Sequence, residues 1–452
     1  MRRFAAKAFV LIGAGITLGA ILLIGCRQET ASDSVVMAPD KNVAAGRVLA
    51  IIPDNTQNLF RIDFSLTGAG VAVVQESAGK VRVVLNGKPG KLYQSVGTMV
   101  LSPDGQRVAY NALDNDKWRI VVDEKEYPAE GEIGSPIFSP DSRHVAYEAR
   151  VDNNWRLIID GNKYLKSRRN HFYHDKFFSS DSNNIITVES TEQNHNTYRV
   201  VVSSLGLKQL NVINAQGKNL GFNKERTKMV ILEEKNGQQR LAMCDVGRLD
   251  TVTYSPMYDS IIRYAFTETG DSVVYIVERS EKRYLVMNGK EVKIPIKGVV
   301  EFITARPDKD AAGLIMNSLD GSYLYQHARN KSTAGKVYDE AAHLIYSKDA
   351  SRHVYVAKKG KKVFIVVNGK VGPPYDMVVS PVFTPDDKHL VYRARKNGKR
   401  FVVVADANGK TISRHPAYEQ VFQPVFTDDG KSVAYGVKDG NKLIWKVEQL
   451  CN

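Results

Sequence analysis

The chain has 452 residues, of which 43% are hydrophobic and 25% are charged, and its formal net charge is +14. Three cysteines without metal-type spacing argue against a cysteine-based metal site. The basic charge favours anionic partners.

The N-terminal residues predict an export signal. A basic start, Met1-Arg2-Arg3 with Lys7, precedes an apolar run over residues 8–25 that stops at Cys26. We expect residues 1–25 to be removed as a signal peptide. An uncleaved membrane anchor and an ordinary secretory signal are the alternatives, because the run approaches the ~18 apolar residues that can span a bilayer.

The end of this run resembles the signal of bacterial lipoproteins. Leu23-Ile24-Gly25-Cys26 has a branched apolar residue, then two small or apolar residues, then cysteine. The resemblance implies cleavage between Gly25 and Cys26 and acylation of the Cys26 thiol with fatty acids such as palmitate, which would anchor the protein to a membrane. Arg27 replaces the aspartate of the inner-membrane retention signal, so the resemblance implies the outer membrane, facing the periplasm.

A linker and one long array follow the signal. Residues 26–45 are mostly small and polar without periodicity, which predicts a flexible linker. Without the basic residues of the signal, the mature chain still carries about +11, which outside the cytoplasm favours an envelope protein or anionic glycan over nucleic acid. Residues 46–452 contain no Pro/Gly-rich linker. They are predicted to form one repeat array.

A short signature recurs with a period of about 40 residues. Four clear copies occupy residues 102–110, 139–147, 384–392 and 427–435, and Ser102-Pro103-Asp104-Gly105 begins the first. Weaker copies begin at Ser65, Ser179, Thr267 and Ser347, and degenerate ones lie near Asn223 and Ala305. The chain therefore has about ten copies.

Each copy predicts four short antiparallel strands. Proline, aspartate and glycine favour a turn between the first and second strands. The dipeptides at 86–87, 160–161, 288–289 and 368–369 are Asn-Gly or Asp-Gly, which favour a type I′ hairpin between the third and fourth strands. A four-stranded sheet of this size cannot bury both faces alone, so the copies must pack around an axis.

The repeats therefore predict an all-β fold, a β-propeller of four-stranded blades. The last copy ends one strand short, and residues 47–52, ahead of the first complete copy, could supply the missing outer strand. This closure favours one large ring, while two smaller tandem propellers remain an alternative.

The repeats resemble those of the TolB-type, WD-repeat-like β-propellers of bacterial envelopes. The similarity spans most of residues 46–450, strongly at both ends and weakly over residues 205–335. TolB itself has a separate N-terminal α/β domain and fewer blades, so the resemblance does not imply a role in the Tol system.

The motifs of common catalysts do not occur in the sequence. It contains no Gly-x-Ser-x-Gly elbow and no phosphate-binding glycine loop, and we expect no cofactor. His171 and His174 could form a metal-ligand pair, and Asp114-Asn115-Asp116 a calcium loop, but an ordinary loop and turn explain them better. We expect neither a metal site nor a catalytic set. Cys244 and Cys451 could pair in an oxidising compartment, but two free thiols are the favoured interpretation.

A binding face is predicted at the mouth of the central channel. Ser135, Ser380 and Gln423 each precede a proline that leads into an innermost strand, so they should border the channel. Tyr375 and Tyr418 lie just upstream and either pack between blades or form a peptide-binding mouth.

Lysine-rich hairpins that contain Lys359 and Lys399 should concentrate positive charge on the same side. The sequence thus favours a noncatalytic, lipid-anchored envelope protein that binds or scaffolds a protein or glycan. The alternative is a propeller enzyme, a hydrolase or lyase, that acts on an envelope glycan or lactone.

Overall fold

The computed structural model describes residues 46–452 except 54–55, 57, 129–130, 152–153, 162, 167–170, 192–193, 207, 247, 296–297, 428 and 451–452. The predicted signal and linker, including Gly25 and Cys26, lie outside the described residues, as does Cys451. No helix in the described part is both long and apolar enough to cross a bilayer.

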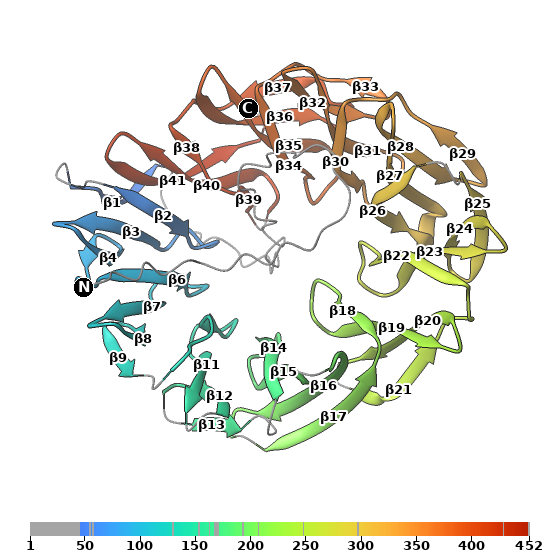
Figure 1. Ribbon diagram of the computed structural model, residues 1–452. Coiled ribbons are helices and arrows are strands. Elements are labelled where there is room, and N and C mark those ends of the chain that lie inside the picture. Colours follow the sequence, from blue (N-terminus) through green and yellow to red (C-terminus); the bar gives the residue numbers. More distant parts are fainter. Residues whose placement is uncertain are drawn as a thin grey trace, which may run out of the picture. The chain divides into compact units, whose positions relative to one another are not determined.

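Ten antiparallel sheets follow one another around a ring (Figure 1). We number them as blades in chain order. Blades 1 to 9 each contain four consecutive strands, and the first strand of each lies nearest the axis (Figure 1). Blade 10 combines the C-terminal strands with the first strand of the described chain.

Blade 1 contains β2 (Leu59–Phe64), β3 (Val71–Ser77), β4 (Lys80–Leu85) and β5 (Lys88–Pro89). Blade 2 contains β6 (Ser95–Leu101), β7 (Val108–Asp114), β8 (Lys117–Val122) and β9 (Lys125–Pro128). Blade 3 contains β10 (Ile137–Phe138), β11 (Val145–Val151), β12 (Asn154–Ile159) and β13 (Lys163–Lys166). Blade 4 contains β14 (His171–Phe178), β15 (Asn184–Thr191), β16 (Asn194–Ser204) and β17 (Gln209–Gln216). Blade 5 contains β18 (Lys218–Phe222), β19 (Lys228–Lys235), β20 (Gln238–Asp245) and β21 (Arg248–Tyr254).

Blade 6 contains β22 (Ser260–Phe266), β23 (Val273–Arg279), β24 (Lys282–Met287) and β25 (Lys290–Ile294). Blade 7 contains β26 (Val299–Arg306), β27 (Ala311–Ser318), β28 (Gly321–Ala328) and β29 (Lys331–Ala334), with the short 3₁₀ helix η1 (Pro307–Lys309) between the first two. Blade 8 contains β30 (Glu340–Tyr346), β31 (His353–Lys359), β32 (Lys362–Val367) and β33 (Lys370–Val371). Blade 9 contains β34 (Met377–Phe383), β35 (His389–Lys396), β36 (Lys399–Asp406) and β37 (Thr411–Arg414). Blade 10 contains β38 (Gln420–Val421), β39 (Val425–Phe426), β40 (Ser432–Asp439), β41 (Lys442–Gln449) and β1 (Arg47–Ile51).

The hydrophobic core is divided among the blade interfaces. Ten clusters of buried side chains occur, and each joins two neighbouring blades. Each sheet thus buries both faces, as expected for a blade. The tenth cluster packs Ala50, Ile52 and Leu443 of blade 10 against Val71 and Val73 of blade 1. The predicted single ring is therefore confirmed, and the alternative of two tandem propellers is excluded.

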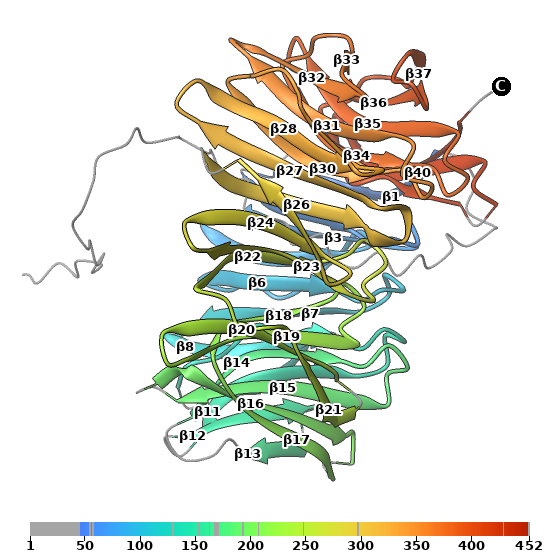
Figure 2. The ribbon, with the colours of Figure 1, turned by 90° about the vertical axis from the view of Figure 1, so that its right-hand side faces the viewer.

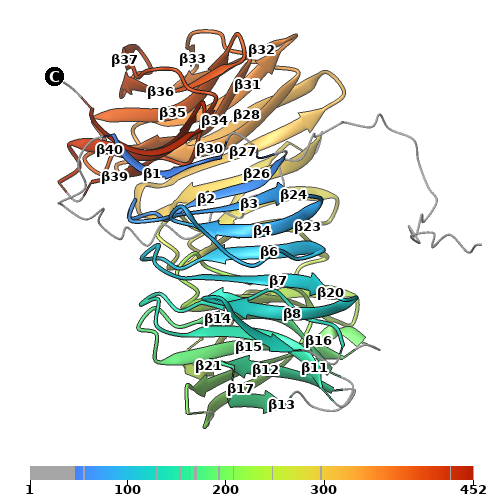
Figure 3. The same cartoon turned by 90° about the vertical axis from the view of Figure 1, so that its left-hand side faces the viewer.

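The predicted closing strand is also confirmed. β1 pairs with β41 as the outer strand of blade 10, with Arg47 opposite Trp445 and Ile51 opposite Lys442 (Figures 1 and 3). Pairing the outer edge of β41 in this way leaves no unpaired edge on it for another chain to join.

Aromatic packing seals the seam between blades 10 and 1. The ring of Phe64 lies 4.8 Å from that of Phe422 and 6.3 Å from that of Trp445, which is 1% exposed. Gly436 lies against this packing, because a Cβ there would stand 2.5 Å from the Phe64 ring.

Gly436→Val is expected to destabilise the ring by about 1–3 kcal/mol or more, because the added methyls overpack the seam. Thermal unfolding followed by circular dichroism measures the effect. Gly206→Val is the control, because an added Cβ at Gly206 meets only the Ser204 hydroxyl, at 3.7 Å. Equal melting temperatures for the two variants would contradict a tight seam.

Candidate functional site

The strand order gives the propeller two chemically different faces, which lie on opposite sides of the edge-on ring (Figure 2). One face carries the turns between first and second strands and between third and fourth strands. The opposite face carries the hairpins between second and third strands and the connections from each blade to the next. We call these the turn face and the hairpin face.

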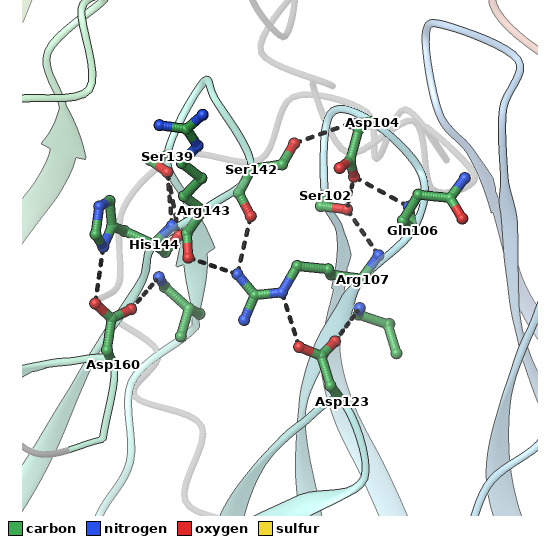
Figure 4. A network of polar contacts seen from close by, with 12 residues as sticks. Ser102, Asp104, Gln106, Arg107, Asp123, Ser139, Ser142, Arg143, His144 and Asp160 are labelled. Atoms are coloured by element: carbon green, nitrogen blue, oxygen red, sulfur yellow. Dashed lines mark hydrogen bonds and ion pairs between the residues drawn. The ribbon is translucent and has the colours of Figure 1, made fainter.

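The signature residues build the turn face. The Ser102 hydroxyl donates to Asp104 Oδ1 at 2.5 Å and accepts a hydrogen bond from the Arg107 amide at 2.9 Å, while the Gln106 amide donates to Asp104 Oδ1 at 3.0 Å (Figure 4). The same pattern recurs at Ser139, Ser179, Ser347, Thr384 and Thr427. The Ser and Thr hydroxyls, together with backbone amides, lower the pKa of Asp349 and Asp386 in these turns.

Neighbouring turns are joined across the blade interface. The Arg107 guanidinium contacts Asp123 of its own blade at 2.8 Å and donates to the backbone carbonyls of Ser142 and Arg143 in blade 3, at 2.9 and 2.6 Å (Figure 4). The Asp104 amide donates to Ser142 Oγ at 3.0 Å. These signature side chains therefore have a structural role: they stabilise the turns and hold neighbouring blades together.

The predicted type I′ turns are confirmed. Asn86-Gly87, Asp160-Gly161, Asn288-Gly289 and Asn368-Gly369 all have two successive positive φ angles. In addition, Asn86 Oδ1 accepts a hydrogen bond from the Val71 amide at 2.8 Å, which caps the second strand of the blade.

The innermost strands are irregular in every blade. Regular pairing with the second strand breaks at one point in eight of them, between 59 and 61, 96 and 99, 173 and 175, 218 and 221, 261 and 263, 300 and 302, 342 and 345, and 379 and 382. In blade 3 the break precedes the short β10, and in blade 10 it separates β38 from β39. Such breaks turn side chains out of the regular alternation.

The three residues predicted before prolines all lie in these breaks. Ser135 precedes buried Pro136 and is exposed, Ser380 lies in the break of β34 with a φ of 52°, and Gln423 lies between β38 and β39. Proline cannot donate to the ladder, which explains the breaks in these blades. Ser380 and blade 10 are linked by Arg393, which donates to Ser380 Oγ and to the Val421 carbonyl, both at 3.2 Å. Ser135 belongs to blade 3, which lies three blades beyond blade 10 around the ring.

A polar sector of the wall runs through blades 2 to 4. Ser135 Oγ donates to Thr98 Oγ1 at 3.2 Å, which joins the breaks of blades 2 and 3. Behind them, Glu148 and Lys176 form an ion pair at 2.5 Å with side chains only 9% and 7% exposed. Lys176 belongs to the innermost strand β14, and Glu148 to β11.

This ion pair was not predicted from the sequence, although the repeat pattern contains a signal for it. Glu148 directly follows the signature Val-Ala-Tyr, at a position occupied by Val74, Ile276 and Val356 in other blades. Asn111 and Arg393 occupy the same position in blades 2 and 9. A polar residue at a normally apolar repeat position is therefore the signal that could have indicated a buried polar contact in blade 3.

An apolar sector lies on blades 6 and 7. Ile262, Val299 and Phe302 of the innermost strands are 37%, 63% and 40% exposed, and β22 contacts β26. Phe60 of blade 1 is 60% exposed. The innermost strands thus present polar side chains in blades 2 and 3 and exposed apolar ones in blades 6 and 7.

Tyr375 and Tyr418 do not border the channel, because they are only 1% and 7% exposed and lie in the clusters between blades. The alternative of packing between blades is the correct one. The Tyr375 ring meets that of Tyr392 edge-on at 6.1 Å. The same arrangement joins Tyr93, Tyr258 and Tyr338, each just before the first strand of a blade, to a tyrosine in the second strand of that blade. The sequence analysis missed this repeated motif.

The remaining candidates have ordinary roles or lie outside the described side chains. Lys359 and Lys399 are exposed on the hairpin face. Asn115 and Asp116 form a hairpin turn with two positive φ angles, and Cys244 is a free, buried thiol whose pKa burial raises to about 11. The side chains of His171 and His174 are not described. Among the described residues no cluster of three His, Cys, Asp or Glu could hold a metal ion.

A crevice of about 180 Å³ lies between blades 7 and 8. Gln326 and Lys336 line it from blade 7, and His353, Tyr355 and Asn368 line it from blade 8. It is smaller than the ~300–1,000 Å³ of typical ligand pockets. Burial lowers the pKa of His353 to about 4, so the imidazole is neutral at neutral pH.

The sequence matches no family model and no curated protein sequence. Similar solved structures include a eukaryotic initiation factor (12% identity, TM-score 0.44, covering 82% of this chain and 97% of that one) and the propeller of Dos1 (11%, 0.38, 93% and 97%). The β-propeller domain of the Trilobed protease from Pyrococcus furiosus is also similar (11%, 0.34, 79% and 98%). These likenesses concern the fold alone and do not distinguish an enzyme from a binding protein.

Glu148→Gln is expected to lower the free energy of unfolding by about 3–5 kcal/mol, because it leaves the Lys176 ammonium buried without its counter-charge. The double variant Glu148→Gln/Lys176→Met should recover most of this loss. Chemical denaturation measures both. The control is Glu340→Gln, which removes the exposed pair with Lys358 and should cost less than about 1 kcal/mol. Equal losses from the two single variants would refute the buried role.

His353→Phe is expected to flatten part of the acid dependence of stability. The pKa of His353 is lower in the folded chain than the ~6.5 of an unfolded histidine, so the unfolded chain binds more protons between pH 6.5 and about 4. The free energy of unfolding of the wild type should therefore fall as pH falls through this window. Above pH 6.5 the full stability of the fold with a neutral His353 is present. Denaturation of both proteins at pH 8, 7 and 4.5 measures the difference. A constant difference at all three values would contradict the neutral imidazole.

Proposed function

We propose that the protein is a noncatalytic, lipid-anchored propeller of the bacterial cell envelope that binds a protein or glycan partner at its channel wall. The observation that carries this proposal is a contrast between two parts of each blade: the turns are nearly identical from blade to blade, and the innermost strands are not. The turns repeat nearly the same contacts from blade to blade, whereas the breaks of the innermost strands present different side chains in each blade.

The wall has the features of a recognition surface. Its apolar sector exposes Ile262, Val299 and Phe302, and its polar sector presents Ser135 and Thr98 beside a buried ion pair. A surface that offers both exposed apolar side chains and fixed polar groups favours binding of another macromolecule. The apolar sector favours a protein over a glycan.

The anchor is proposed from the sequence. Leu23-Ile24-Gly25-Cys26 matches the lipoprotein pattern, and residues 26–45 would connect the acylated Cys26 to β1. A membrane position would give the basic mature chain access to anionic envelope components. The proposed location is the outer membrane, facing the periplasm.

Photo-crosslinking in the native membrane tests the binding wall. A crosslinking residue placed at Ser135, Ser380 or Gln423 is expected to capture one common partner. The controls are Val371 and Ile412, which are 50% and 48% exposed on the outer strands β33 and β37. A partner captured only from the outer strands would contradict the proposed site. Turnover of an envelope glycan or lactone by the purified protein would favour the enzyme instead.

Cys26→Ser is expected to abolish incorporation of labelled fatty acid while leaving the propeller folded. Metabolic labelling and membrane fractionation measure the first effect, and circular dichroism measures the second. Cys244→Ser, which changes a buried thiol inside blade 5, is the control and should be labelled like the wild type. Equal labelling of Cys26→Ser and wild type would refute the lipoprotein assignment.

A further inference from the structure

Positive charge on the hairpin face gathers in three neighbouring blades. The hairpin of blade 8 contains Lys358, Lys359, Lys361 and Lys362, that of blade 9 contains Arg395, Lys396, Lys399 and Arg400, and that of blade 10 contains Lys438 and Lys442. Asp439 is the one acidic residue within these three hairpins.

The hairpins of other blades lack this excess. The hairpins of blades 1, 2 and 5 each contain one basic residue, namely Lys80, Lys117 and Lys235. The hairpin of blade 6 contains Arg279, Lys282 and Arg283, but Glu278 and Glu281 lie among them and reduce its net charge to +1. Blade 2 adds two aspartates beside its lysine, and blade 7 has Asp320 and no basic residue. The concentration in blades 8 to 10 is therefore a property of one sector of the ring.

Part of this charge is compensated locally. Lys358, Lys362 and Lys438 pair with Glu340, Asp376 and Glu419. Glu340 begins the innermost strand β30, and Asp376 and Glu419 directly precede the innermost strands of blades 9 and 10, so three lysines already have a structural partner. Within the described part of the chain, the other lysines of these three hairpins have no acidic partner within 4.0 Å.

Five further lysines form what we call the basic sector: Lys359, Lys361, Lys396, Lys399 and Lys442. All five are exposed, and within the described part of the chain none of them has an ion-pair partner within 4.0 Å. They stand at the tips of hairpins, which in a propeller follow an arc along one face and do not converge on a pocket. Lysine is a strongly hydrated point charge without the fork geometry of arginine, so such an arc suits a diffuse anionic surface.

The chain enters the propeller in a blade that carries part of this sector. β1 is the outer strand of blade 10: its first residue, Arg47, pairs with Trp445, and the strand runs toward the hairpin face, where its last residue, Ile51, pairs with Lys442. Residues 26–45 precede this strand, so the proposed acylated Cys26 is joined to the blade that carries part of the basic sector. A flexible linker of this length spans roughly 25 Å on average.

We propose that the basic sector lies against the headgroups of anionic phospholipids in the membrane that holds the anchor. This proposal rests on the lipid anchor proposed above and adds a defined orientation, with the hairpin face of blades 8 to 10 toward the bilayer. Each lysine near an anionic surface strengthens the attraction about fivefold, and salt screens it beyond roughly 8–10 Å.

The test is lysine reactivity in the intact lipoprotein. The protein is purified with its acyl chains, reconstituted into vesicles of neutral phosphatidylcholine or of phosphatidylcholine with phosphatidylglycerol, and treated with a membrane-impermeant acylating reagent. Mass spectrometry then gives the reactivity of each lysine. We expect the five lysines of the basic sector to react several-fold more slowly in anionic vesicles than in neutral ones, and 0.5 M salt to remove the difference. Lys80, Lys117, Lys235 and Lys282 should react equally in both.

A matched pair of variants separates the sector from overall charge. Lys359→Glu/Lys361→Glu/Lys396→Glu/Lys399→Glu should abolish the protection of Lys442. Lys80→Glu/Lys117→Glu/Lys235→Glu/Lys282→Glu makes the same charge change elsewhere on the hairpin face and should leave that protection intact. Circular dichroism checks that both variants fold.

Three results would overturn the proposal. They are equal reactivity of the basic sector in the two vesicle types, uniform protection of all hairpin lysines, and protection in neutral vesicles on addition of a soluble anionic glycan, which would assign the sector to that glycan. Absence of acyl chains on the purified protein, or failure to enter vesicles of either type, would instead contradict the lipid anchor.

Discussion

Every sheet of this protein is apolar on both faces, and this constraint governs the rest of the structure. A four-stranded blade can bury both faces only between two neighbours, so ten blades need ten interfaces, and the hydrophobic clusters fall one to each. An open array would leave the outer face of Val71 and Val73 in water. Closing the ring with β1 and the aromatic seam around Trp445 removes that exposed surface.

The closed frame leaves the channel wall free to vary. Hydrogen bonds within the signature turns, with Arg107 and Ser142 bridging two of them, fix the spacing of blades on the turn face. Hydrophobic packing between sheets fixes the middle. The innermost strands contribute buried residues such as Met99 and Ile303 to this packing, yet each still contains an irregular segment with its own side chains. Phe60, Ser135 and Ile262 are examples of these side chains.

The sequence predicted the parts of the fold that depend on local chemistry. Turn residues act within six positions, so the signature at Ser102 and the dipeptide Asn86-Gly87 could be recognised without knowledge of neighbours. The closing strand followed from counting strands in the last repeat. Contacts between blades depend on residues some 30 to 40 positions apart in sequence, so the pair of Glu148 and Lys176 was not predicted. The tyrosines at 375 and 418 were ambiguous for the same reason, since only the neighbouring blade shows that they are buried.

The pairing of β1 with β41 also sets an order of events for folding. β1 is made before every other described strand of the ring and β41 after all of them, so the earliest strand has no partner until synthesis of the last blade is complete. This contact joins residues nearly 400 positions apart, and such contacts form slowly because loop closure opposes them. The folding chain therefore passes through a stage with complete inner blades and an unpaired outer edge on β41, and at this stage it is most open to pairing with another chain.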